Sequence, residues 1–96
     1  MAALIDRVTV AITAADSVFT GAGSYVTVTN LDGAGIIYFR VDGTAASAAD
    51  ENYAVPAIAG AYKTVPIGSL KTVSHIATVA ALATIELHDN PPCYCH

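Results

Sequence analysis

Charged side chains are scarce in this 96-residue chain: Lys, Arg, Asp and Glu make up 12% of it, and the formal net charge is −4. Average globular domains carry about 25% charged residues. Nucleic-acid binding depends on Lys and Arg clustered on one surface, where they displace counterions from phosphates. The basic residues here are few and scattered, so we do not expect the chain to bind nucleic acid. They are Arg7, Arg40, Lys63 and Lys71.

Long apolar runs are also missing. No segment approaches the roughly 18 consecutive apolar residues that a membrane span requires. Residues 1–7 lack the basic start and the long apolar stretch of a signal peptide. We therefore expect no membrane partner, and a protein that is made in a cytoplasm and not exported by the ordinary route.

Cysteine is limited to Cys93 and Cys95, which lie too close to the C-terminus to staple a fold. With His96 and His88 they form a candidate zinc set, because zinc binds thiolate and imidazole ligands. The Cys-x-Cys spacing, however, points the two side chains to opposite sides of an extended chain. A tail with free thiols is therefore the preferred interpretation, and no cofactor is expected. A metal site and an interchain disulfide are the alternatives.

What the sequence does contain is alternation with a period of two, which is typical of strands with one buried face. Near the N-terminus Val8, Val10 and Ile12 are expected to point inward, between Thr and Arg side chains that point outward. The same pattern recurs along the chain. The expected strands cover residues 7–13, 25–30, 36–42, 53–56, 63–67, 71–78 and 83–88.

Proline, glycine and aspartate separate these strands. Pro56 and Pro66 cannot donate to a ladder, so the segments that carry them are expected to be edge strands or the ends of strands. Gly and Asp favour turns at 20–24, 30–35, 42–44 and 59–60, while 45–52 is expected to be a loop and 77–83 a turn. The sequence thus predicts an all-β fold, a small antiparallel β-sandwich or Greek-key barrel of about seven short strands. Residues 1–90 form the single domain and residues 91–96 a C-terminal tail.

No group of residues has the arrangement that catalysis requires, so we do not expect an enzyme. The sequence has no Gly-x-Ser-x-Gly elbow, and no motif in it places a base against a nucleophile. His75 falls on the same strand face as Val73, which favours a packed or interfacial histidine. Asp32 and Asp42 each precede a glycine and are interpreted as turn residues, not as calcium ligands.

An excess of apolar residues points to contacts with other proteins. Hydrophobic residues make up 54% of the chain, which is more than the thin core of a domain this size can bury. Tryptophan is absent, and five of the seven aromatic residues are Tyr, a residue favoured at interfaces. If Phe39 lies in the core, Ile36, Tyr38 and Arg40 face outward and are interface candidates. Tyr53 is a further candidate.

Four segments in this order resemble small virion proteins of tailed bacteriophages, notably of phages that infect actinobacteria. They are Val26–Asn30, Ile37–Thr44, Asp50–Pro56 and Thr84–His88. The likeness covers residues 24–88, and the Cys-Tyr-Cys-His ending does not belong to the pattern. The resemblance implies a β-sandwich that is carried in many copies on the capsid or the tail.

The expected function is therefore that of a capsid decoration, or cement, protein, which binds the outside of the head shell and stabilises it. Its partners are then the major capsid protein and copies of itself, in a trimer or another ring, and its location is the virion surface. One alternative is a tail or head-fibre component that binds a host surface ligand through Tyr53, beside Glu51 and Asn52. Another is a module stabilised by a metal at the C-terminal Cys and His residues.

Overall fold

The computed structural model describes residues 4–19, 23–48, 52–68 and 71–88, and these form eight β-strands and no helix. In this part of the chain no helix is available to cross a membrane. The strands are β1 (Leu4–Val10), β2 (Ala15–Val18), β3 (Tyr25–Asn30), β4 (Ile37–Arg40), β5 (Tyr53–Val55), β6 (Tyr62–Pro66), β7 (Thr72–Ala77) and β8 (Ala81–His88).

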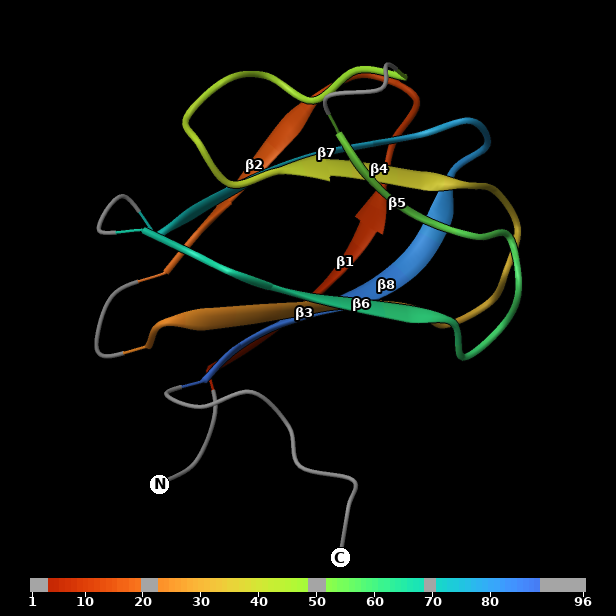
Figure 1. Ribbon diagram of the computed structural model, residues 1–96. Helices are drawn as coiled ribbons and strands as arrows, with labels where there is room; N and C mark the ends of the chain where they lie inside the picture. Colours follow the sequence, from red (N-terminus) through yellow and green to blue (C-terminus); the bar gives the residue numbers. More distant parts are fainter. Residues whose placement is uncertain (1–3, 20–22, 49–51, 69–70, 89–96) are drawn as a thin grey trace, which may run out of the picture.

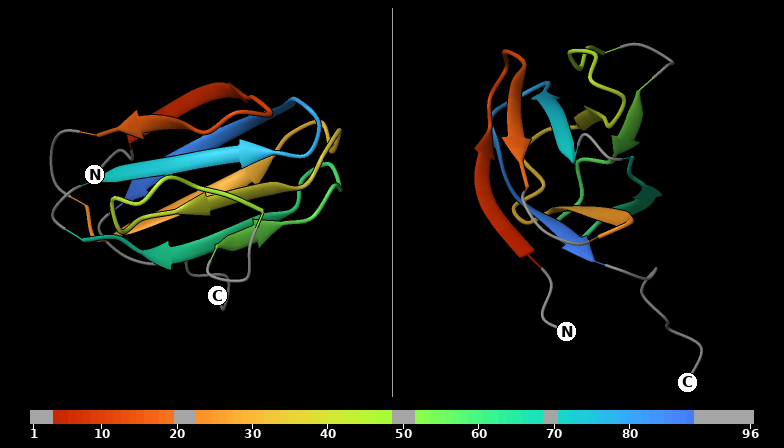
Figure 2. Two further views of the ribbon diagram at one scale, coloured as in Figure 1. Left: turned by 90° about the horizontal axis from the view of Figure 1, so that it is seen from above. Right: turned by 90° about the vertical axis from the view of Figure 1, so that its left-hand side faces the viewer.

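The strands form two four-stranded antiparallel sheets that pack face to face (Figures 1 and 2). Sheet A has the order β1-β8-β3-β6, and sheet B has the order β2-β7-β4-β5. Every pairing among the described strands is antiparallel, and β1 pairs with β8. This order is that of an eight-stranded jelly roll, in which two Greek keys are wound around one core. The expected all-β sandwich is thus confirmed.

Alternating side chains of both sheets fill the core between them. In β8 the side chains of Ala83, Ile85 and Leu87 are buried, and those between them are half-buried on the outer face. The β-branched residues of β3, Val26 and Val28, point to the same core. Burial of such side chains contributes about 1.5–3 kcal/mol each relative to exposure, and it fixes which face of each strand points inward.

Two details of the N-terminal expectation were wrong. β1 ends at Val10, and Ile12 lies in the following bend with 66% of its surface exposed, although the alternation placed it inward. The next strand, β2, was not predicted at all, so there are eight described strands and not seven. β2 has the sequence Ala-Asp-Ser-Val, and its one buried residue is Ser17. Because this inward position holds a small polar residue and not an apolar one, the segment lacks the alternation by which a strand is predicted.

The two strands with prolines lie at sheet edges, as expected. β5 is an edge strand of sheet B and β6 is an edge strand of sheet A. Pro66 closes β6, and Pro56 follows β5 directly. Since proline has no N–H to offer to a further strand, these positions limit pairing with another chain at these edges.

The turn expected at 30–35 belongs to a crossing between the sheets over residues 31–36, because β3 and β4 lie in different sheets. Asn30 organises it. Its buried side chain accepts a hydrogen bond from the N–H of Gly33 and donates to the carbonyl oxygens of Gly35 and Pro56. Gly33 has a positive φ of 68°, a conformation that side chains disfavour.

Aspartates act in these turns as the sequence predicted. Asp32 accepts from the backbone N–H of Ala34, and Asp42 accepts from that of Thr44. The region 77–83 is a turn over a shorter range than expected, because β8 already begins at Ala81.

Candidate docking surface

The outer face of sheet B carries two of the predicted interface residues, Tyr38 and Arg40. β4 points Ile37 and Phe39 into the core, so Tyr38 and Arg40 project from the opposite face, where both are half-buried. In the antiparallel register Tyr38 lies opposite Ile76 of β7. An aromatic and an aliphatic side chain are therefore neighbours on the outside of the sheet.

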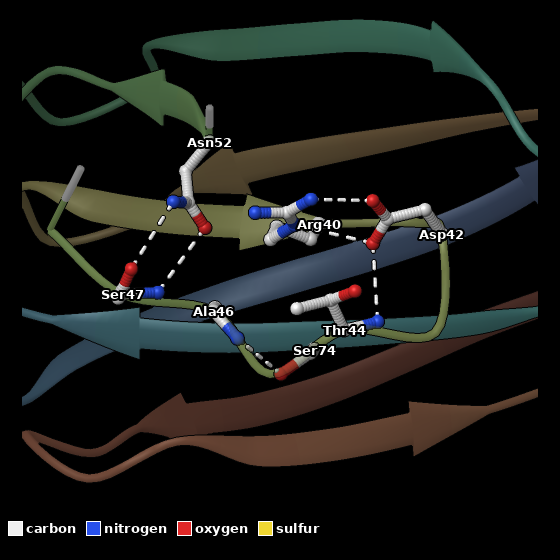
Figure 3. Close-up of polar contacts among 7 residues, drawn as sticks. All are labelled: Arg40, Asp42, Thr44, Ala46, Ser47, Asn52 and Ser74. Atoms are coloured by element: carbon white, nitrogen blue, oxygen red, sulfur yellow. Dashed lines mark hydrogen bonds and ion pairs between the residues drawn. The ribbon is translucent and has the colours of Figure 1, made fainter. Parts of the chain in front are cut away.

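Residues 42–48, which we call the strap, follow β4 and cross this face (Figure 3). At its start the Asp42 carboxylate accepts hydrogen bonds from the Arg40 guanidinium, with Nε 3.1 Å from Oδ1, and from the backbone N–H of Thr44. The Arg40 guanidinium, and after it the Thr44 amide, hold the pKa of Asp42 well below its usual value. The carboxylate is therefore charged at neutral pH and fixes the first turn of the strap.

Further contacts hold the strap against the sheet. The backbone N–H of Ala46 donates to the hydroxyl of Ser74 in β7, 2.8 Å away, and Ala46 is buried at this point. The N–H of Ser47 donates to the side-chain oxygen of Asn52, which lies just before β5. The expected loop in this region is thus a fixed cover over β4 and β7 in its described part, residues 45–48 (Figure 3).

A cavity of about 270 Å³ opens beside the strap. Its mostly apolar lining comes from the β1–β2 turn, β4, the strap, β7 and the turn after β7. The lining residues are Ile12, Tyr38, Ala48, Ile76, Ala77 and Thr78. A preformed apolar cavity beside an aromatic ring can receive an apolar side chain of a partner without first rearranging.

The other two interface candidates lie elsewhere. Ile36 is half-buried just before β4, at the end of the sandwich, where its N–H donates to the Thr78 hydroxyl at 3.0 Å. Tyr53 lies opposite Phe39 on the inner side of sheet B, with the ring centroids 5.3 Å apart. The Lys63 ammonium lies 6.0 Å from the centroid of the Tyr53 ring. The structure therefore does not bring the four candidates together on one surface.

Among the metal candidates, Cys93, Cys95 and His96 lie outside the described residues. His88 ends β8 on the outer face of sheet A, where its Nε2 is 2.9 Å from the hydroxyl of Thr27. No group of three or more metal-binding side chains occurs within residues 4–19, 23–48, 52–68 and 71–88.

His75 is packed in the core, as its position on the same face as Val73 predicted. It is 1% exposed, and its Nε2 lies 3.0 Å from the hydroxyl of Ser17 in β2. This contact joins an edge strand to its neighbour β7 through polar atoms that are enclosed between the sheets. The pair is therefore part of the interior, and a substrate has no access to it.

On the candidate docking surface the sequence identified Tyr38 and Arg40 but not the other residues, among them Ile76, Ser74 and Ile12. Ile76 had a signal, because it is out of phase with Val73 and His75 on β7 and therefore points outward. Ser74 and Ile12 had none, since their roles depend on the strap and on a bend that join segments distant in sequence.

No protein-family model matches this chain, and no curated protein or solved structure matches it either.

Proposed function

We propose that this chain is a structural protein of a tailed-phage virion, a decoration protein that binds the outside of the head shell and stabilises it. The resemblance of residues 24–88 to small phage virion proteins supports this assignment. The two-sheet jelly roll is an architecture that viral capsid domains and lectins share, and this support is an analogy of fold.

The observation that carries the proposal is the apolar cavity beside Tyr38 on the outer face of sheet B. An apolar side chain from a shell subunit would fill it and bury Tyr38 and Ile76. Aromatic residues in desolvated pockets contribute much of the binding energy of protein interfaces. The strap is already hydrogen-bonded to Ser74, so little conformational entropy is lost when the partner binds.

Such binding would stabilise the shell by mass action. A protein that binds the assembled shell and not its dissociated subunits shifts the equilibrium toward the assembled state. Many weak sites on one shell add up in this effect, so each copy needs only a modest affinity.

The test is co-sedimentation of the purified protein with head shells assembled from the major capsid protein of the same genome. We expect saturable binding at a fixed copy number per shell, and shells that dissociate at a higher denaturant concentration when the protein is bound. Tyr38→Ala should weaken binding about tenfold or more, as expected for a buried aromatic contact worth at least about 1.4 kcal/mol. Failure of the wild-type protein to sediment with shells would refute the proposal.

A matched control is Tyr62→Ala. Tyr62 is a half-exposed tyrosine of β6 on the outer face of sheet A, away from the cavity. This variant should bind shells as the wild type does. Equal losses in both variants would mean that the cavity is not the docking site.

A further inference from the structure

The end of the sandwich opposite the start of β1 is built from four loops: residues 11–14, 31–36, 56–61 and 78–80. We call this end the tip. The strand directions bring these loops together, since Val10 pairs with Ala81 at this end and Leu4 pairs with Leu87 at the other. Figure 1 shows the β3–β4, β5–β6 and β7–β8 loops gathered on the right-hand side.

Backbone contacts join the four loops into one continuous surface. The N–H of Ala77 donates to the carbonyl of Ala11, and the N–H of Thr78 donates to the carbonyl of Ile36. On the other side, Gly33 lies so close to the 56–61 loop that an added Cβ would be 2.6 Å from the Ala59 nitrogen. The tip is therefore a preformed surface, and a partner does not have to order it.

The tip is apolar to a degree that no other described surface matches. Three of the four exposed large aliphatic residues in the described part of the chain lie on it: Ile12 at 66%, Ile58 at 63% and Val79 at 55% exposure. The fourth, Val18, is on β2. The rest of the tip is mostly Ala, Gly and Thr, which leave room for the backbone of a partner to approach.

Charge distinguishes the tip just as clearly. The chain has twelve charged residues (eight Asp or Glu and four Lys or Arg), and Asp32 is the only one in the four loops. Its carboxylate accepts hydrogen bonds from the backbone N–H groups of Ala34 and Leu82. The second contact directs it toward β8, at the sheet A side of the tip.

From these observations we infer that the tip is the surface through which copies of this chain associate with one another. Each copy carries a net charge of −4, so copies repel one another wherever their charged surfaces meet. The tip is where two acidic copies can come into contact with little repulsion. A strongly charged partner would find no complementary charges there, whereas a second copy presents the same apolar, nearly uncharged tip, so two tips can bury Ile58 and Val79 against each other. The tip shares Ile12 and Thr78 with the lining of the cavity on sheet B, but Ile58 and Val79 are not part of that lining.

Sedimentation velocity of the full chain over a range of concentrations tests the inference. We expect a defined oligomer in the wild type, and a dissociation constant at least about tenfold higher in Ile58→Asp, because the substitution brings unpaired carboxylates together in an apolar interface. Val79→Asp, in another loop of the tip, should act in the same direction. Both positions are exposed, so the variants should unfold at nearly the wild-type urea concentration.

Val18→Asp is the matched control, because Val18 is as exposed as Ile12 but lies on β2, outside the tip. It adds the same charge and should leave the dissociation constant near that of the wild type. Added NaCl should strengthen the association, because it screens repulsion between acidic copies and leaves apolar contacts intact.

Three results would overturn the inference: a wild-type protein that stays monomeric at every concentration, association that NaCl weakens, or equal effects of Val18→Asp and Ile58→Asp. A monomer that still binds shells through Tyr38 would overturn only this inference and leave the proposed function standing. An oligomer that ignores shells would do the reverse.

Discussion

The side-chain amide of Asn30 donates a hydrogen bond to the carbonyl oxygen of Pro56, 3.0 Å away, and so ties the end of β3 in sheet A to the residue after β5 in sheet B. The same side chain also accepts a hydrogen bond from the N–H of Gly33 and donates one to the carbonyl oxygen of Gly35, and Asn30 is completely buried. One polar residue therefore satisfies three backbone groups where the chain crosses between the sheets.

Asn30→Ala should lower the free energy of unfolding by about 3 kcal/mol, since buried backbone groups lose their partners. Urea unfolding measures the change. Asn52→Ala is the control, because the hydrogen bonds of Asn52 to Ser47 are exposed, and it should cost less than about 1 kcal/mol. Similar costs for the two variants would contradict the role of Asn30 described above.

Substitution of two glycines of the tip should distinguish the cost of a strained backbone from the cost of steric crowding. Gly33 and Gly60 both have positive φ, but an added Cβ meets the Ala59 nitrogen at 2.6 Å from Gly33 and nothing within 4 Å from Gly60. Gly60→Ala should cost about 1 kcal/mol for the left-handed backbone alone. Gly33→Ala should cost at least about 2 kcal/mol more, because backbone must move to make room. Equal melting temperatures of the two variants would show that the backbone at Ala59 moves away from an added Cβ at position 33 at little cost in free energy.

Removal of the Ser74 hydroxyl, which accepts the hydrogen bond from the Ala46 N–H, should loosen the strap without unfolding the sandwich. In Ser74→Ala the buried N–H of Ala46 loses its acceptor, at a cost of about 1–2 kcal/mol. Hydrogen exchange at the Ala46 amide should be faster by about tenfold or more, while exchange in the β3–β8 ladder changes in line with global stability. Ser47→Ala, an exposed position in the same strap, should leave the Ala46 amide protected. An unchanged exchange rate of the Ala46 amide in Ser74→Ala would contradict the role of Ser74 in holding the strap.

The fall in the free energy of unfolding at low pH should depend on Asp42. Its folded-state pKa lies below the unfolded value of about 3.9, so its contribution is complete above that value and is lost as the pH falls. Urea unfolding from about pH 5 down to about pH 2 should show a smaller loss of stability in Asp42→Asn than in the wild type. Backbone N–H groups of Ala34 and Leu82 lower the pKa of Asp32 in the same way. Adding Asp32→Asn should flatten the profile further, and identical profiles would refute this account.

Strand character was largely readable from the sequence because the core is built on simple alternation. In β3, β4 and β8 the apolar residues that point inward are separated by single outward-facing residues. This alternation predicted that Phe39 and Tyr38 point to opposite faces of their strand, and the structure places Phe39 in the core. The prolines identified β5 and β6 as edge strands for a reason that is local to the backbone.

What the sequence could not predict depends on contacts between distant segments. β2 is held by pairing with β7 and by the Ser17–His75 contact, not by an apolar pattern of its own. The cavity beside Tyr38 exists because the strap reaches Ser74, 28 positions from Ala46. Ile12 followed the alternation of β1 but lies beyond the residue at which that strand ends.

The position of β8 between β1 and β3 in sheet A determines when β1 can join the sheet during synthesis. β1 is an edge strand whose neighbour is β8, and β8 also separates β1 from β3. β1 therefore has no neighbour in sheet A to pair with until β8 has been synthesised. Until then its apolar side chains stay exposed on the nascent chain, where other hydrophobic segments can capture them. Sheet A should thus form only after β8 has been synthesised, and yield in recombinant expression should improve at low temperature or with chaperones that shield β1.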